Sequence, residues 1–108
     1  PISLTLDFSA DALVYTVTSG KTLFITDLSV FIENDNTGAP GRVEFQDGTS
    51  AASTLVYAML AQEAGNSQSA VVAQSTSFLE PLQFDTGVFV DEISGTITLT
   101  GTLQGYEE

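Results

Sequence analysis

Carboxylates dominate the reactive side chains of this 108-residue chain, which has 14 acidic residues and neither histidine nor cysteine. Without those two residue types, a Ser-His-Asp triad, a thiol nucleophile and a Cys or His zinc site are excluded. Three pairs of carboxylates stand close in sequence: Asp91 with Glu92, Glu33 with Asp35, and Glu80 with Asp85. A glycosidase holds two carboxyl groups about 5 to 10 Å apart around a sugar-sized cleft, which a core this small rarely leaves. We therefore expect a protein that is not an enzyme.

Residues 33–36, Glu-Asn-Asp-Asn, place four oxygen-bearing side chains in sequence. Calcium takes six to eight oxygen ligands, so a calcium-dependent adhesion module is one interpretation. The run lacks the Asp-x-Asp-x-Asp-Gly spacing of a calcium-binding loop. Asn and Asp are also common in loops because their side chains bond the local backbone. We favour this second explanation and expect no metal and no other cofactor.

A ladder of hydroxyl groups is the other chemical pattern. Four threonines alternate near the end of the chain: Thr96, Thr98, Thr100 and Thr102. Such a ladder can bind ice or sugar, although Thr is also favourable on any solvated sheet face. Carbohydrate sites usually add exposed aromatic rings, and the chain has no Trp and three tyrosines: Tyr15, Tyr57 and Tyr106. Single tyrosines are more often part of a core or its rim.

Alternation of apolar and polar residues predicts short β-strands that would position these groups. Residues 2–8 place Ile2, Leu4, Leu6 and Phe8 on one face. Further strands are predicted over residues 13–18, 22–33, 42–46, 53–60 and 70–79. Clusters of Gly, Pro, Ser, Asn and Asp predict turns or loops at residues 9–11, 19–21, 34–41, 47–48 and 65–67.

The phase of the alternation reverses within residues 22–33. Leu23 and Ile25 alternate in one phase, and the apolar residues from Leu28 to Ile32 alternate in the other. Because a slip of one residue would turn half of this apolar set toward water, we predict a β-bulge or bend near Thr26–Asp27.

The clearest strand pattern runs from Phe84 to Leu103. Val88 and Val90 alternate in its first half, and Ile97, Leu99 and Leu103 alternate in its second half. Ile93-Ser94-Gly95 supplies a turn between the two halves. We predict an antiparallel hairpin with one apolar face and one hydroxyl face.

Residues 51–64 allow two interpretations. Their composition favours a helix that Gly65 would cap, whereas Leu55, Tyr57 and Met59 alternate as in a strand. We favour a strand over residues 53–60 because every neighbouring segment is predicted as strand. Pro81 cannot donate a ladder hydrogen bond, so it marks a sheet edge or the start of a strand.

Short strands at spacings of about 8 to 12 residues, without βαβ alternation, are typical of a β-sandwich. We therefore predict an all-β fold: one antiparallel, jelly-roll-like sandwich of about eight strands spanning residues 1–108.

The net charge of -12 makes nucleic acid and anionic membranes unfavourable partners, so we expect neither. Lys21 and Arg42 could anchor an acidic partner, but solvated surface charge is the usual role of such residues. No run approaches the roughly 18 apolar residues of a membrane span. The first residues have neither the basic region nor the long apolar region of a signal peptide. Pro1 fits a chain that has lost its initiator Met, so we expect a cytoplasmic origin.

Two segments carry a family resemblance. VYTVTSGKTLFITDLSVFIEN (Val14 to Asn34) and FLEPLQFDTGVFVDEISGTITLTGTLQGYEE (Phe78 to Glu108) resemble small virion proteins of tailed bacteriophages. Those proteins share an opening YTV-P-x-GK-x-L-I-T-D motif, a later P-L-x-F-x-T-G-V-x-V motif and a closing strand that ends near GY. Thr18 stands where the family has Pro. The resemblance covers about half of the chain, and its motifs are turns and strands rather than catalytic signatures.

The resemblance implies a virion protein of jelly-roll type that decorates or cements a capsid, made in the host cytoplasm and bound to the major capsid protein. Such proteins are commonly homotrimers. As a candidate interaction element we single out the apolar first strand, with Ile2, Leu4, Leu6 and Phe8, which could add to a neighbouring subunit's sheet or belong to its own sandwich. The alternative is a carbohydrate- or receptor-binding module of a tail or fibre.

Overall fold

The computed structural model describes residues 1–8, 10–34, 40–51, 53–61, 70–93 and 97–108. These residues form eight strands and no helix, and therefore no helix that could cross a membrane. The strands are β1 (Ile2–Phe8), β2 (Ala12–Thr16), β3 (Leu23–Asn34), β4 (Gly41–Asp47), β5 (Thr54–Ala61), β6 (Ala70–Phe84), β7 (Gly87–Ile93) and β8 (Ile97–Glu107).

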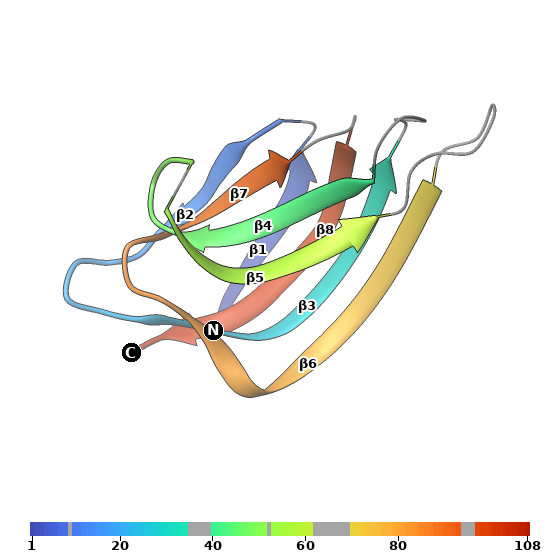
Figure 1. Ribbon diagram of the computed structural model, residues 1–108. Helices are drawn as coiled ribbons and strands as arrows, with labels where there is room; N and C mark the ends of the chain where they lie inside the picture. Colours follow the sequence, from blue (N-terminus) through green and yellow to red (C-terminus); the bar gives the residue numbers. More distant parts are fainter. Residues whose placement is uncertain (9, 35–39, 52, 62–69, 94–96) are drawn as a thin grey trace.

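The strands make two antiparallel sheets of four, which face each other across the core (Figure 1). Sheet A has the order β1-β8-β3-β6, and sheet B has the order β2-β7-β4-β5. Successive strands therefore pass from one sheet to the other, except at β4–β5, and this strand order is that of a jelly roll. The predicted all-β, jelly-roll-like sandwich of eight strands is confirmed.

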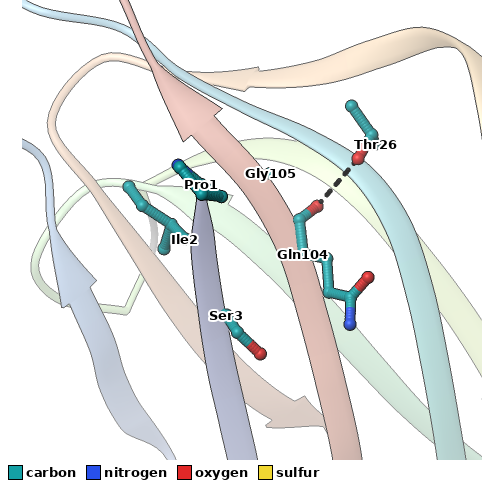
Figure 2. A pocket seen from close by; sticks show the side chains of 6 residues that line it. All are labelled: Pro1, Ile2, Ser3, Thr26, Gln104 and Gly105. Atoms are coloured by element: carbon teal, nitrogen blue, oxygen red, sulfur yellow. Dashed lines mark hydrogen bonds between the residues drawn. The ribbon is translucent and has the colours of Figure 1, made fainter.

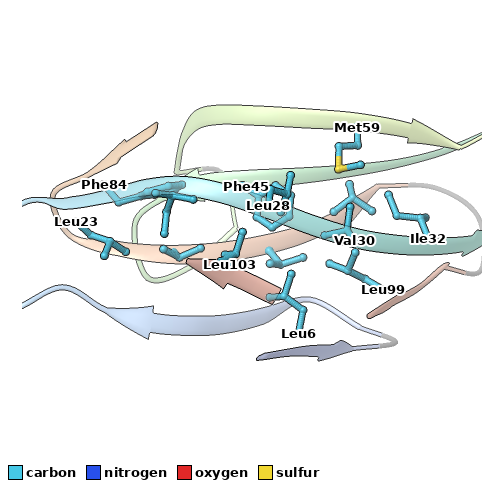
Figure 3. Close-up of a cluster of buried hydrophobic side chains, with 14 of the residues drawn as sticks. Leu6, Leu23, Leu28, Val30, Ile32, Phe45, Met59, Phe84, Leu99 and Leu103 are labelled. Carbon is cyan, nitrogen blue, oxygen red and sulfur yellow. The ribbon is translucent and has the colours of Figure 1, made fainter. Parts of the chain in front are cut away.

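The alternating apolar residues meet between the two sheets (Figure 3). The largest fully buried side chains come from both sheets: Phe45, Phe84, Leu6, Leu23, Ile25, Leu28, Ile32, Leu99 and Leu103. Burial of this apolar surface is the main force that holds the sheets together.

The predicted bulge at Thr26–Asp27 is confirmed. The pairing of β3 with both β8 and β6 shifts register between Ile25 and Asp27. On β8 the partners of these two residues are adjacent, Gly105 and Gln104, so Thr26 is the extra residue. The shift keeps both apolar sets of β3 in the core, as the reversed alternation requires.

The predicted turn after the second strand is also confirmed. The Lys21 amide donates to the Thr18 carbonyl oxygen at 3.0 Å, which closes the turn around Ser19 and Gly20. Gly20 has φ +80°, a conformation that glycine adopts without steric cost.

The strand favoured over residues 53–60 is confirmed as β5, which runs from Thr54 to Ala61, and the helical alternative is wrong for these residues. β5 pairs along β4, and its Met59 is buried in the core. The tertiary pairing overrides the helix-forming composition. Residues 70–79 are also a strand, and Pro81 lies in β6 at an edge of sheet A.

The predicted hairpin between Phe84 and Leu103 is wrong. β7 pairs with β2 and β4 in sheet B, whereas β8 pairs with β1 and β3 in sheet A. Alternation predicts which face of a strand is buried, but two strands of one apolar core can lie in either sheet. The apolar faces themselves are as predicted, since Val88, Val90 and Leu99 are fully buried.

Several predicted turns involve positions outside the described residues. These are position 9, the loop positions 35–39, the turn at 65–67 and positions 94–95.

Candidate interaction surfaces

The candidate interaction residues of β1 face the interior of their own sandwich. Leu6 is 1% exposed, and Ile2, Leu4 and Phe8 are partly buried against the core. β1 lies at the edge of sheet A, and among the described residues it pairs only with β8. Its open feature is therefore the backbone edge and not the apolar side chains.

The pair Asp91–Glu92 is divided between two faces of β7. The Asp91 carboxylate accepts a hydrogen bond from Gln46 Nε2 at 3.1 Å on the outside of sheet B. Glu92 follows Val88 and Val90 in the inward phase, and both of its carboxylate oxygens are buried without a hydrogen-bond partner. Burial, and then the charge of Asp11, raises the pKa of Glu92 to about 7. The two carboxylates therefore do not act on one site.

The remaining carboxylate pairs also fail to form a catalytic arrangement. Asp85 accepts a hydrogen bond from the Thr22 hydroxyl at 2.7 Å, while Glu80 lies on the exposed part of β6. Glu33 is half-buried on β3, and its predicted partner at position 35 lies outside the described residues, as does position 36 of the calcium interpretation. No group of three or more acidic residues in the described part of the chain is placed to hold a metal ion.

Arg42 is held within its own sheet. Its Nε lies 2.7 Å from Glu44 Oε2, and Gln46 Nε2 donates to Glu44 Oε1 at 2.9 Å. These bonds, the one from Arg42 first, lower the pKa of Glu44. Lys21 is exposed in the turn after β2.

The outer side of sheet A is rich in hydroxyl groups, and we call it the hydroxyl face. One row of four residues crosses all four strands in register: Thr5, Thr102, Ser29 and Ser75. The next row consists of Ser3, Gln104, Asp27 and Ser77. The threonine ladder of β8 is the centre of this face, with position 96 outside the described residues. Phe31, 44% exposed, and Tyr106, 38% exposed, are the large rings on the face.

Two shallow hollows adjoin on the hydroxyl face beside the bulge, and both include Gln104. One, of about 370 Å³, is lined by Pro1, Ile2, Ser3, Thr26, Gln104 and Gly105 (Figure 2). The other, of about 230 Å³, is lined by Asp27, Leu28, Ser29, Ser75, Thr76, Thr102 and Gln104.

The bulge fixes a carboxylate in the second of these hollows. The Ser77 hydroxyl donates to Asp27 Oδ1 at 2.7 Å, and the Thr26 hydroxyl lies 2.8 Å from Asp27 Oδ2. The bond from Ser77, followed by that from Thr26, lowers the pKa of Asp27. Near them on the same face, Tyr106 stacks on Phe24 with ring centroids 5.2 Å apart.

A second surface, which the sequence reasoning missed, lies where β5 and β6 approach each other. β5 is an edge of sheet B and β6 an edge of sheet A, and the Tyr57 ring packs edge-on against Phe78 between them. Gln74 Nε2 also donates to the Tyr57 hydroxyl oxygen at 2.6 Å. We call this surface the β5–β6 side.

The strands of the β5–β6 side have long uncharged runs and several exposed apolar residues. Neither residues 53–61 nor residues 70–79 include a charged side chain. Four of the seven exposed large hydrophobic residues recorded for the described chain belong to these strands: Leu55, Leu60, Val71 and Leu79. Long uncharged runs in a chain of net charge -12 are the sequence signal that could have indicated this surface.

No protein-family model and no curated protein matches this chain. The hydroxyl face and the β5–β6 side are therefore identified as candidate surfaces from geometry and charge alone.

Proposed function

We propose that this protein is a non-enzymatic structural protein of a virus particle, which binds the outer shell as a homo-oligomer and stabilises it. The proposal rests on the resemblance of two segments to small virion proteins of tailed bacteriophages, and its partner would be the major capsid protein. The observation that carries it is the hydroxyl face, a broad surface with few charges on a strongly acidic protein.

The chemistry of the hydroxyl face suits a macromolecular surface. It spans four strands, its hollows are shallow, and its central row has no charged residue. Depletion of charge and enrichment of aromatic rings are typical of the cores of protein–protein interfaces. Phe31, flanked by Thr100 on β8 and Ala73 on β6, would provide the apolar contact.

Shells that lack the protein provide the test. Purified protein added to such shells should bind and raise the temperature at which they open, because a ligand that binds only the intact state stabilises that state. Phe31→Asp should abolish binding, whereas Leu13→Asp should not. Leu13 is a matched control because it is 43% exposed on sheet B, compared with 44% for Phe31 on sheet A. Unchanged heat resistance of the shells after addition of the wild-type protein would refute the proposal.

A carbohydrate-binding module is the second candidate, and the two hollows around Gln104 favour it. They combine hydroxyl, amide and carboxylate groups with the Tyr106 ring nearby, and jelly rolls include lectin domains. On a glycan array, Gln104→Ala and Tyr106→Ala should each lose the signal of the wild-type protein. An array without any bound glycan would eliminate this candidate.

A further inference from the structure

The free edge of β6 is the feature of sheet A that its own fold leaves incomplete. β6 is 15 residues long and occupies one margin of the molecule in Figure 1. On one side it pairs with β3, in unbroken register from Ala70 opposite Asn34 to Ser77 opposite Asp27. Among the described residues no strand pairs with its other side. A row of backbone N–H and C=O groups is therefore open to a further strand.

The other three edge strands are blunted along the part that could pair, whereas in β6 the register shift against β3, Glu80 and Pro81 all lie beyond Ser77. β1 has only seven residues and carries the exposed Asp7. β2 has five residues and a register shift between Leu13 and Tyr15. The pairing of β5 with β4 shifts at Phe45–Gln46, which leaves a shorter regular segment. Residues 70–77 of β6 have no charge, proline or glycine, and thus none of the usual protections against edge pairing.

We propose that β6 pairs antiparallel with β6 of a second copy of this chain. Antiparallel pairing of two identical strands obeys two-fold symmetry, so each open donor meets an acceptor of the same segment. The two four-stranded sheets then form one continuous sheet of eight strands, with both hydroxyl faces on the same side.

Charge favours a second copy at residues 70–77 of β6 over the edge of β1, which carries the exposed Asp7. Two chains of net charge -12 repel each other, but residues 70–77 are uncharged. On the neighbouring strand β3 the acidic residues are Asp27 and Glu33, opposite Ser77 and Val71, and on β6 itself the exposed Glu80 lies beyond the uncharged segment. Across the paired edge the two β3 strands stand three strand spacings apart, about 14 Å. This separation exceeds the Debye length of about 8 Å at physiological ionic strength, so the repulsion is screened.

The pairing gives an even number of copies and so replaces the trimer that the family resemblance implies. The role of this pairing rests on the proposed function. A dimer would present two hydroxyl faces to one shell and would bind it by avidity. The pairing itself needs no shell and can be measured on the purified protein.

Light scattering of the purified chain is the first test, with a mass of two chains expected. Ala73→Asp places a charge in the middle of the paired segment, at an exposed position, and should raise the dissociation constant at least about 100-fold, since like charges brought together cost several kcal/mol. Thr5→Asp is the matched control: it is exposed on the same face, but on the opposite edge strand, and should remain a dimer. Circular dichroism confirms that each variant folds.

A charge exchange distinguishes edge pairing from a general loss of association. Ala73→Lys alone should also be monomeric, while a mixture of the Ala73→Asp and Ala73→Lys variants should recover the dimer. Raising the salt concentration should strengthen the wild-type dimer by screening its net charge. A wild-type monomer at every concentration, a trimer, or a dimer that survives Ala73→Asp would overturn the pairing. The wild-type protein separates the pairing from the proposed function, because a wild-type dimer that fails to bind shells would refute the function and leave the pairing in place.

Discussion

β1 and β6 are the two edge strands of sheet A, and they differ in the side chains that they expose. β1 alternates strongly, and its apolar side chains, such as Leu6, face the core. β6 alternates weakly, and it exposes Val71 and Leu79 to solvent. Strong apolar alternation therefore indicates a strand whose apolar side chains are buried within its own sandwich. A long uncharged segment with weak alternation and exposed apolar residues, as in residues 70–79 of β6, is the better candidate for contact with a partner.

The largest expected difference between the two edges is in folding stability. Leu6→Ala on β1 removes a side chain that is 1% exposed and should lower the free energy of unfolding by about 2 to 5 kcal/mol. Leu79→Ala on β6 removes a side chain that is 101% exposed and should change it by less than about 0.5 kcal/mol. Urea denaturation in the Ala73→Asp background measures both without a contribution from association. Equal changes in the free energy of unfolding for the two variants would contradict the difference between β1 and β6.

We expect the C-terminal end of β6 to be fixed in place, so that the exposure of its side chains does not come from local flexibility. The Asp47 carboxylate accepts hydrogen bonds from the amides of Asp85, Thr86 and Gly87, in the turn that follows β6. Asp47→Ala should cost about 1 to 2 kcal/mol in urea denaturation, and Asp47→Asn, which keeps one acceptor oxygen, should cost less. If Asp47→Ala leaves the free energy of unfolding unchanged, other contacts fix this end of β6.

The pH dependence of stability should arise from Glu92 on β7, and not from the uncharged residues 70–77 of β6. Glu92 has its pKa raised to about 7 by burial and by Asp11, from a usual value of 4.5. Between those two pH values the folded chain binds more protons than the unfolded chain, so stability falls as pH rises through this window. Glu92→Gln should remove that fall and raise stability at pH 8 by about 1 kcal/mol, because an unpaired buried carboxylate is lost.

Thermal unfolding between pH 4 and pH 8 measures this effect. Glu107 is the internal reference, since hydrogen bonds from Tyr15 and from Thr18 lower its pKa to about 2. Its contribution is present above its usual pKa and disappears only as pH falls toward 2. A Glu92→Gln curve parallel to the wild type from pH 4.5 to 7 would contradict the assignment.

Much of the fold follows from local sequence pattern. The reversed alternation around Thr26 predicted the bulge, and Gly20 predicted the turn before β3. Pro81 predicted a sheet edge or the start of a strand, and the structure shows the edge. Each of these features is decided by a few neighbouring residues, through steric limits or the loss of a hydrogen-bond donor.

The features that the sequence reasoning missed depend on distant partners. Alternation in Val88 to Leu99 shows which face is buried, but the choice of sheet is decided by β2, β4, β1 and β3. The exposure of Leu79 likewise depends on the edge position of β6 in sheet A. Within the hydroxyl face, Thr98 to Thr102 were identified from β8 alone, while the row through Thr5, Ser29 and Ser75 requires the register.

Amide hydrogen exchange at two protein concentrations tests the contrast between the edges most directly. Outward-facing amides of residues 70–77 should exchange more slowly at the higher concentration, where β6 is paired, while those of residues 2–8 should not change. Exchange that is independent of concentration in β6, or slowed in β1 instead, would contradict the assignment of β6 as the interacting edge.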